Sequence, residues 1–136
     1  TPGTVRQETG QDRSDFAAFS WNSGSLFGSA EQQMMSSANQ FNSLANAYVE
    51  KTKSRCHGDF AAVPVMSQEN GTMRISSYEI ACVDGQDGAA ASIVFYNDGN
   101  LFTAIAHETG LQTMDVAMDA RDSLIRYLWQ SPLASR

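Results

Sequence analysis

The sequence predicts an α+β domain in which an antiparallel meander sheet of four to five strands packs against two amphipathic helices. Strand-like apolar residues concentrate in residues 74–108, where three segments are separated by glycine-containing turns. Apolar residues recur at helical spacing on either side of this region, over residues 29–53 and 109–129. A chain of 136 residues is long enough for one domain with its own core.

The N-terminal part divides into a polar and an aromatic segment. Residues 1–14 are polar and lack periodicity, so we expect a flexible tail followed by a single domain over residues 15–136. The next segment holds large apolar side chains among Gly and Ser, and we expect it to be a short strand or cover on the sheet. The alternative is a docking segment for a partner protein, with the candidate binding residues Phe16, Phe19, Trp21 and Phe27.

Residues 29–53 are predicted to form the first helix. Ser29 and Gln32 have the spacing of a capping box, which would satisfy the first free N–H groups. One face is apolar at helical spacing and consists of Met34, Ala38, Phe41, Leu44, Ala45 and Tyr48. We expect this helix to cover one face of the sheet.

Residues 60–65 are predicted to form a strand that turns at Asn70-Gly71. Pro64 lacks an N–H group for the ladder, so this strand is expected at an edge of the sheet. The hairpin sets Asp59 opposite Cys82 and thereby brings Cys56 near Cys82. We therefore predict a Cys56–Cys82 disulfide, worth roughly 3 kcal/mol in the chain-entropy model. It implies a periplasmic or secreted location, whereas two buried free thiols are the alternative.

The strands of residues 75–83 and 91–108 are predicted to form the rest of the meander. The Asp98-Gly99 dipeptide favours a tight hairpin that pairs Phe95 with Phe102. One face of this hairpin is then apolar and consists of Ala91, Ile93, Phe95, Phe102, Ala104 and Ala106. The opposite face carries both polar and apolar side chains, and we expect it to be partly exposed to solvent.

The register of the preceding strand is chosen by burial. Setting Tyr78 opposite Phe95 and Ile80 opposite Ile93 keeps the apolar faces together. A slip of one residue would place Glu79 on the core side, which is costly.

A second helix is predicted from Thr109 to about Trp129. Thr109 and Gln112 again have the spacing of a capping box, and Pro132 ends the helix. One stripe of this helix is mainly apolar and consists of Met114, Met118, Arg121, Leu124, Ile125 and Leu128.

Charge and motif content narrow the classes of function. A net charge of −6 argues against nucleic acid or an anionic membrane as partner, and no apolar run approaches the length of a membrane span. His107 and Glu108 are a candidate polar site, because a His beside a carboxylate can act as an acid–base pair or bind a metal. A hydrogen-bonded His at a strand end is the alternative, and we expect no cofactor.

The order of elements over residues 16–130 is a possible strand, a helix, an antiparallel meander and a closing helix. This order resembles the Mog1/PsbP-like α/β/α sandwich. The resemblance is topological and matches no motif of that group, so it assigns no role to any residue. Members of the group serve mainly as accessory or binding proteins, which implies binding rather than catalysis.

Together these features predict an exported, non-catalytic accessory or protein-binding domain with another protein as its partner. One alternative is an acidic intracellular partner-masking protein, such as an immunity protein or a secretion chaperone. The other alternative is a small hydrolase or metal enzyme centred on His107 and Glu108.

Overall fold

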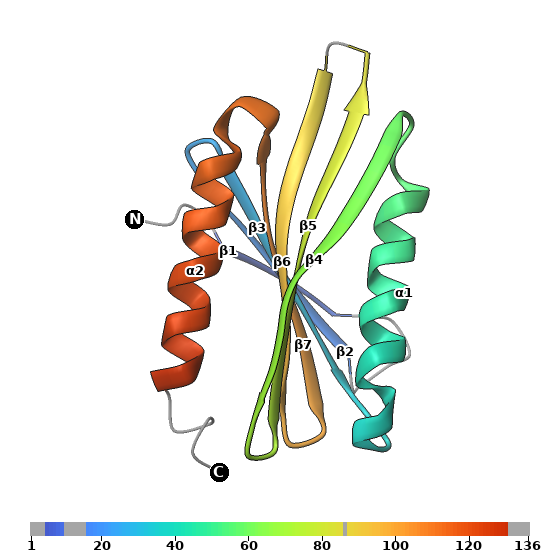
Figure 1. The fold of residues 1–136 in the computed structure, drawn as a ribbon, viewed down its shortest axis with the longest axis vertical. Coiled ribbons are helices and arrows are strands. Elements are labelled where there is room, and N and C mark those ends of the chain that lie inside the picture. Colours follow the sequence, from blue (N-terminus) through green and yellow to red (C-terminus); the bar gives the residue numbers. More distant parts are fainter. Residues whose placement is uncertain (1–4, 10–15, 86, 131–136) are drawn as a thin grey trace.

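The computed structural model of this chain describes residues 5–9, 16–85 and 87–130. It consists of one antiparallel sheet with a helix on each face (Figure 1). The strands lie in the order β1-β2-β3-β7-β6-β5-β4. In chain order the elements are β1 (Val5–Thr9), β2 (Phe16–Ser23), β3 (Leu26–Met34), η1 (Ala38–Gln40), α1 (Phe41–Ser54), β4 (Asp59–Asn70), β5 (Met73–Asp84), β6 (Asp87–Asp98), β7 (Leu101–Gly110), η2 (Leu111–Thr113) and α2 (Met114–Gln130).

The α+β class is confirmed, but the sheet has more strands than the four to five predicted. Six strands, β2 to β7, form its body, and the short β1 pairs with β2 at one edge. The β2–β3 hairpin pairs through β3 with β7. Strand β7 therefore lies inside the sheet, between β3 and β6. Within the segment predicted to be a tail, only β1 is described, and the rest lies outside the described residues.

The prediction that the first helix begins at Ser29 is wrong. Ser29 lies in β3, and α1 begins at Phe41. A two-residue turn with Gly24 at a φ of 60° joins β2 to β3, which places β3 beside β7. Because the backbone groups of a buried strand such as β7 need partners on both sides, pairing prevails over a weak capping pattern.

The apolar face predicted for the meander is confirmed. Helix α1 covers it, and the resulting cluster includes Phe41, Ala45, Ile80, Ile93, Phe95, Phe102, Ala104 and Ala106, with Tyr48, Tyr78 and Ala91 packed against it. Phe41 meets Phe102 edge-on, with ring centroids 5.3 Å apart. These aromatic contacts join α1 to the centre of the sheet.

The hairpin registers differ from the predicted ones by two residues. Phe95 pairs with Ala104 rather than Phe102, and Tyr78 pairs with Ile93 rather than Phe95. A shift by two keeps each side chain on its predicted face, because side chains alternate with period two. The observed pairs leave turns of two residues, in which Gly85 and Gly99 have positive φ. The predicted pairs would have left longer loops between the strands.

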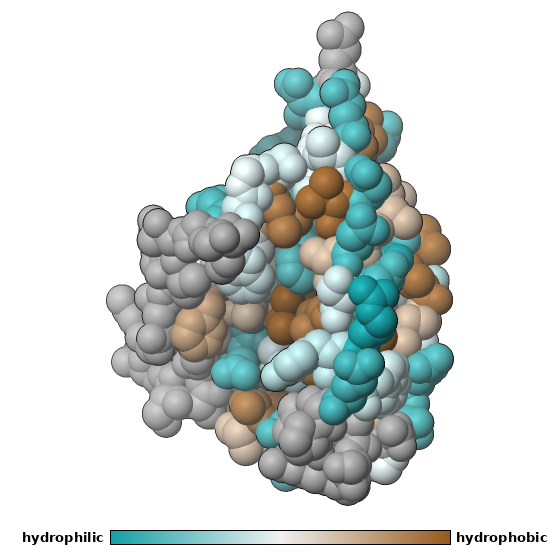
Figure 2. Space-filling model, turned by 90° about the vertical axis from the view of Figure 1, so that its left-hand side faces the viewer, coloured by the Kyte–Doolittle hydropathy of each residue, from teal (hydrophilic) through white to brown (hydrophobic). Residues whose placement is uncertain are grey.

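The opposite face, expected to be partly wet, is covered by α2. Its apolar cluster consists of Met73, Ile75, Val94 and Leu128, with Leu124, Ile125 and Trp129 packed against it. The two helices therefore lie on opposite sides of the sheet and form three layers (Figure 1). From the side of α2, Figure 2 shows a band of hydrophilic residues along the helix with hydrophobic residues beside it.

The predicted helix start at Thr109 is also wrong. Thr109 belongs to β7, is buried, and caps no helix; η2 follows at Leu111 and α2 begins at Met114. Arg121 lies in the predicted stripe and is 7% exposed. Its guanidinium donates to the carboxylate of Glu79 on β5 at 2.7 Å, so a buried charge is paired across the interface.

Candidate functional site

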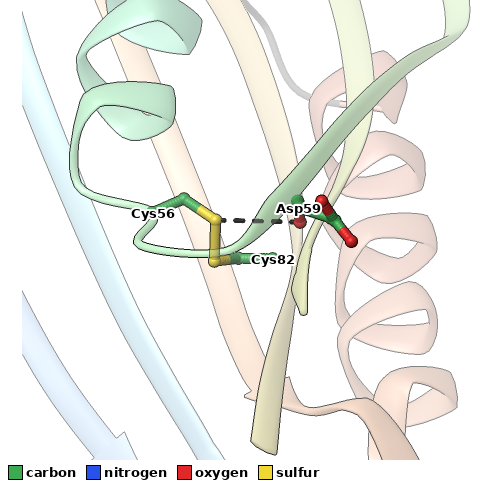
Figure 3. Close-up of a disulfide and its surroundings, with 3 residues drawn as sticks. All are labelled: Cys56, Asp59 and Cys82. Atoms are coloured by element: carbon green, nitrogen blue, oxygen red, sulfur yellow. Dashed lines mark hydrogen bonds between the residues drawn. A yellow bond between two sulfur atoms is a disulfide. The ribbon is translucent and has the colours of Figure 1, made fainter. Parts of the chain in front are cut away.

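The predicted Cys56–Cys82 disulfide is present and ties the end of α1 to β5 (Figure 3). The two Cα atoms are 5.8 Å apart. Phe60, rather than Asp59, lies opposite Cys82, because the turn begins after Asn70 and a bulge near Val65 shifts the register. At Gly58 an added Cβ would lie 2.0 Å from the carbonyl oxygen of Val83, so this connection runs directly against β5 and requires glycine.

A cleft of about 290 Å³ lies between the second half of α1 and the sheet, and we call it the α1–β3 cleft. Phe27, Tyr48, Phe60 and the disulfide form its walls. Small and aliphatic residues form its floor: Ile80, Ala89, Ala91, Ile93 and Ala106. The alanines leave room beside α1 that larger side chains would fill, so the cleft is a consequence of their size.

Tyr48 connects the cleft to the core. Its ring meets Phe95 edge-on at 5.5 Å, and the Lys51 ammonium lies 5.2 Å from its centroid. Burial raises the pKa of Tyr48 to about 12, with a further contribution from the Glu31 carboxylate, which is itself paired with Lys51 at 2.9 Å. A hydrogen bond to Ser29 acts in the opposite direction. The phenol is therefore a neutral hydrogen-bonding group at physiological pH.

Two exposed residues of opposite charge, Arg55 and Glu108, also line the cleft. Both act electrostatically on Tyr48, Arg55 lowering its pKa and Glu108 raising it. The charges of this pair offset each other, which favours an uncharged group over an ion on the apolar floor.

Among the candidate partner-binding residues whose side chains are described, Trp21 and Phe27 lie on opposite faces of the sheet. Trp21 lies on the α2 side of the sheet, where its ring meets His107 edge-on at 5.9 Å and covers Gly28. Phe19, two residues away in β2, shares that face. Phe27 lines the α1–β3 cleft on the other side and is 40% exposed. The side chain of Phe16 lies outside the described part of the chain.

His107 and Glu108 are not brought together. As consecutive residues of β7, they point to opposite faces of the sheet. His107 is 8% exposed, and burial lowers its pKa; its Nδ1 has no hydrogen-bond partner among the residues that the structure describes. Glu108 is exposed at the α1–β3 cleft. The alternation of side chains along a strand is a signal in the sequence that predicts this separation.

Sequence reasoning missed Tyr48, Arg55 and the alanine floor as parts of a site. The available signal was the set of alanines at inward positions of the meander, which indicates space under a helix. The sequence places Tyr48 only on the apolar face of the first helix, because its separation from Glu108 along the chain conceals that both residues line one cleft.

Within the described ranges, no three residues among His, Cys, Asp and Glu are grouped closely enough to hold a metal ion. No helix in these ranges is long and apolar enough to cross a bilayer. No known family model matches the sequence, and no curated protein is detectably similar to it. Its function is therefore inferred from the geometry of the site.

Proposed function

We propose that this protein is an exported, non-catalytic accessory domain that binds another protein at the α1–β3 cleft. The observation that carries the proposal is a cleft with an apolar floor and an exposed aromatic residue, Phe27, in its wall. Protein interfaces are commonly anchored where an aromatic or aliphatic side chain enters a pocket that excludes water. The offset charges of Arg55 and Glu108 favour such an apolar anchor.

Export is supported by the disulfide between Cys56 and Cys82. Disulfides persist in oxidising compartments and are rare in the reducing cytosol. The bond also forms a wall of the cleft, so an intact disulfide helps to maintain the proposed binding surface.

A binding function is favoured over hydrolysis by the polar groups of the cleft. Tyr48 has a raised pKa, which makes it a poor nucleophile at neutral pH. Glu108 and His107 lie on opposite faces, which removes the specific reason for an acid–base pair. The resemblance of the element order in the sequence to the Mog1/PsbP-like group, whose members are mainly accessory or binding proteins, also favours this proposal.

Site-specific photo-crosslinking tests the proposal. A photoreactive phenylalanine analogue at Phe27, in the cells that produce the protein, is expected to yield one discrete crosslinked protein. Tyr127 is 67% exposed on α2 and provides the matched control. Loss of the Phe27 product when Ala106→Leu fills the cleft would support direct docking. Identical products from both positions, or none from Phe27, would contradict it.

The acidic partner-masking alternative retains one specific observation. Asp115 and Asp119 are exposed on the outer side of α2, where they could face a basic partner. Crosslinks from Tyr127 alone, together with free thiols in alkylated whole-cell protein, would favour this alternative. Cysteines that resist alkylation in whole cells because they form a disulfide would favour export.

A further inference from the structure

A second hollow, of about 490 Å³, lies on the other side of α1, between this helix and strands β4 and β5. We call it the α1–β4 hollow. None of its nine lining residues is charged, and its hydrogen-bonding side chains are Asn42, Asn46, Ser67, Ser76 and Tyr78. It shares no lining residue with the α1–β3 cleft, so its role is independent of the proposed protein-binding function.

A bulge in the edge strand shapes the hollow. Pro64 lies opposite Tyr78 and Met66 lies opposite Ser77, so Val65 is an extra residue in β4. Such a bulge bends a strand and redirects its side chains, and bulges are frequent beside functional sites. Pro64, Val65 and Met66 all line the hollow, which connects this irregularity to the space beside α1.

The polar groups of the hollow are able to bind a ligand. Asn42 and Asn46 are one helical turn apart and exposed, and neither amide has a hydrogen-bond partner among the described residues. The hydroxyl oxygens of Ser67 and Ser76 are 3.3 Å apart. Amides and hydroxyls each donate and accept hydrogen bonds, so the hollow offers both functions at several points.

These groups discriminate between classes of ligand. An ion entering the hollow would lose hydration and meet no opposite charge among the lining residues. A wholly apolar molecule would leave the amides and hydroxyls without partners. A neutral molecule with several hydroxyl groups avoids both costs, because adjacent hydroxyls can accept from an amide N–H and donate to its carbonyl oxygen.

Tyr78 adds an apolar surface to these polar groups. Its half-buried ring is held edge-on against Phe95 at 5.9 Å. The C–H face of a sugar ring is apolar, so a sugar that enters the hollow has an apolar surface to place against the Tyr78 ring. The volume lies within the range of small-molecule sites, about 300–1,000 Å³.

We propose that the α1–β4 hollow is a binding site for a neutral sugar. Asn42 and Asn46 bind its hydroxyl groups from the helix, Ser67 and Ser76 bind from the sheet, and Tyr78 contacts the ring. The sugar is either a free monosaccharide or a residue of a longer glycan, because both present the same chemistry.

The test is an NMR titration of the isotope-labelled chain with D-glucose, D-galactose and N-acetyl-D-glucosamine. At least one sugar is expected to cause saturable shifts at the amides of Asn42, Asn46 and Ser76, with none at Phe27. The double substitution Asn42→Ala and Asn46→Ala is expected to weaken binding about tenfold or more without lowering the melting temperature. Asn39→Ala removes an exposed amide that lines neither site and should leave the affinity unchanged.

Disaccharides show whether the ligand is a free sugar or part of a longer glycan, and charged sugars provide a further test of the proposal. Maltose, cellobiose or N,N′-diacetylchitobiose binding more tightly than its monosaccharide indicates a glycan, and equal affinity indicates a free sugar. Tighter binding of glucuronate or glucosamine than of the neutral sugars would overturn the proposal. So would unchanged affinity in the double variant, or the absence of saturable shifts with every mono- and disaccharide.

Discussion

Removal of the Cys56–Cys82 disulfide should lower stability through the unfolded chain. The bond joins residues separated by 26 positions, for which the chain-entropy relation gives about 3.5 kcal/mol at 25 °C. For a domain of this size, each kcal/mol corresponds to a change of about 3–4 °C in melting temperature. The Cys56→Ala, Cys82→Ala double variant should therefore melt about 10–14 °C below the oxidised protein.

Urea denaturation monitored by circular dichroism measures this effect. Four samples are compared: the wild type and the double variant, each with and without a reducing agent. The reduced wild type should match the double variant, whereas the double variant should not respond to the reductant. In the reduced wild type and in the double variant, the free energy of unfolding should also fall more steeply with urea concentration than in the oxidised protein. The reason is that the uncrosslinked chain exposes more surface on unfolding.

Two results would refute the chain-entropy reasoning for this bond. A stability loss below about 1 kcal/mol would mean that the unfolded chain is already restricted near these cysteines. A loss well above about 5 kcal/mol would mean that the bond also holds the native packing of α1 against β5. The second result is distinguished by altered NMR signals of Tyr48 in the folded variant.

Two further predictions concern the α2 side of the sheet. Gly28→Ala should destabilise the fold by about 1–3 kcal/mol and shift the Trp21 indole NMR signal, because its Cβ would lie 2.0 Å from that ring. Gly110→Ala, where an added Cβ meets nothing within 4 Å, should have little effect, and equal losses at both positions would contradict the steric reason. Burial lowers the pKa of His107 in the folded state, so its contribution to stability is full above the unfolded pKa of about 6.5 and is lost as the pH falls below that value. His107→Gln should reduce this acid-dependent loss in pH-dependent denaturation, and an unchanged slope would count against the titration of His107.

The sequence by itself determined which side chains share a face and which cysteines pair. Ile93 and Phe95 lie inward even though the hairpin register is shifted by two, because alternation along a strand does not depend on the exact partner. Pro64 indicates an edge strand through its missing N–H group, and β4 is indeed at the edge. Each of these conclusions follows from local covalent geometry.

Only the tertiary structure decided the rest of the fold. Ser29 has a capping pattern, yet it lies in a strand because the open side of β7 requires a hydrogen-bond partner. In the sequence, Arg121 is a charged residue within a mainly apolar stripe. In the structure, α2 places it against Glu79, which pairs its charge. The α1–β3 cleft likewise joins Tyr48 to Glu108, which are 60 positions apart. Such contacts depend on which surfaces compete for burial across the whole chain, and short-range patterns carry no information about that competition.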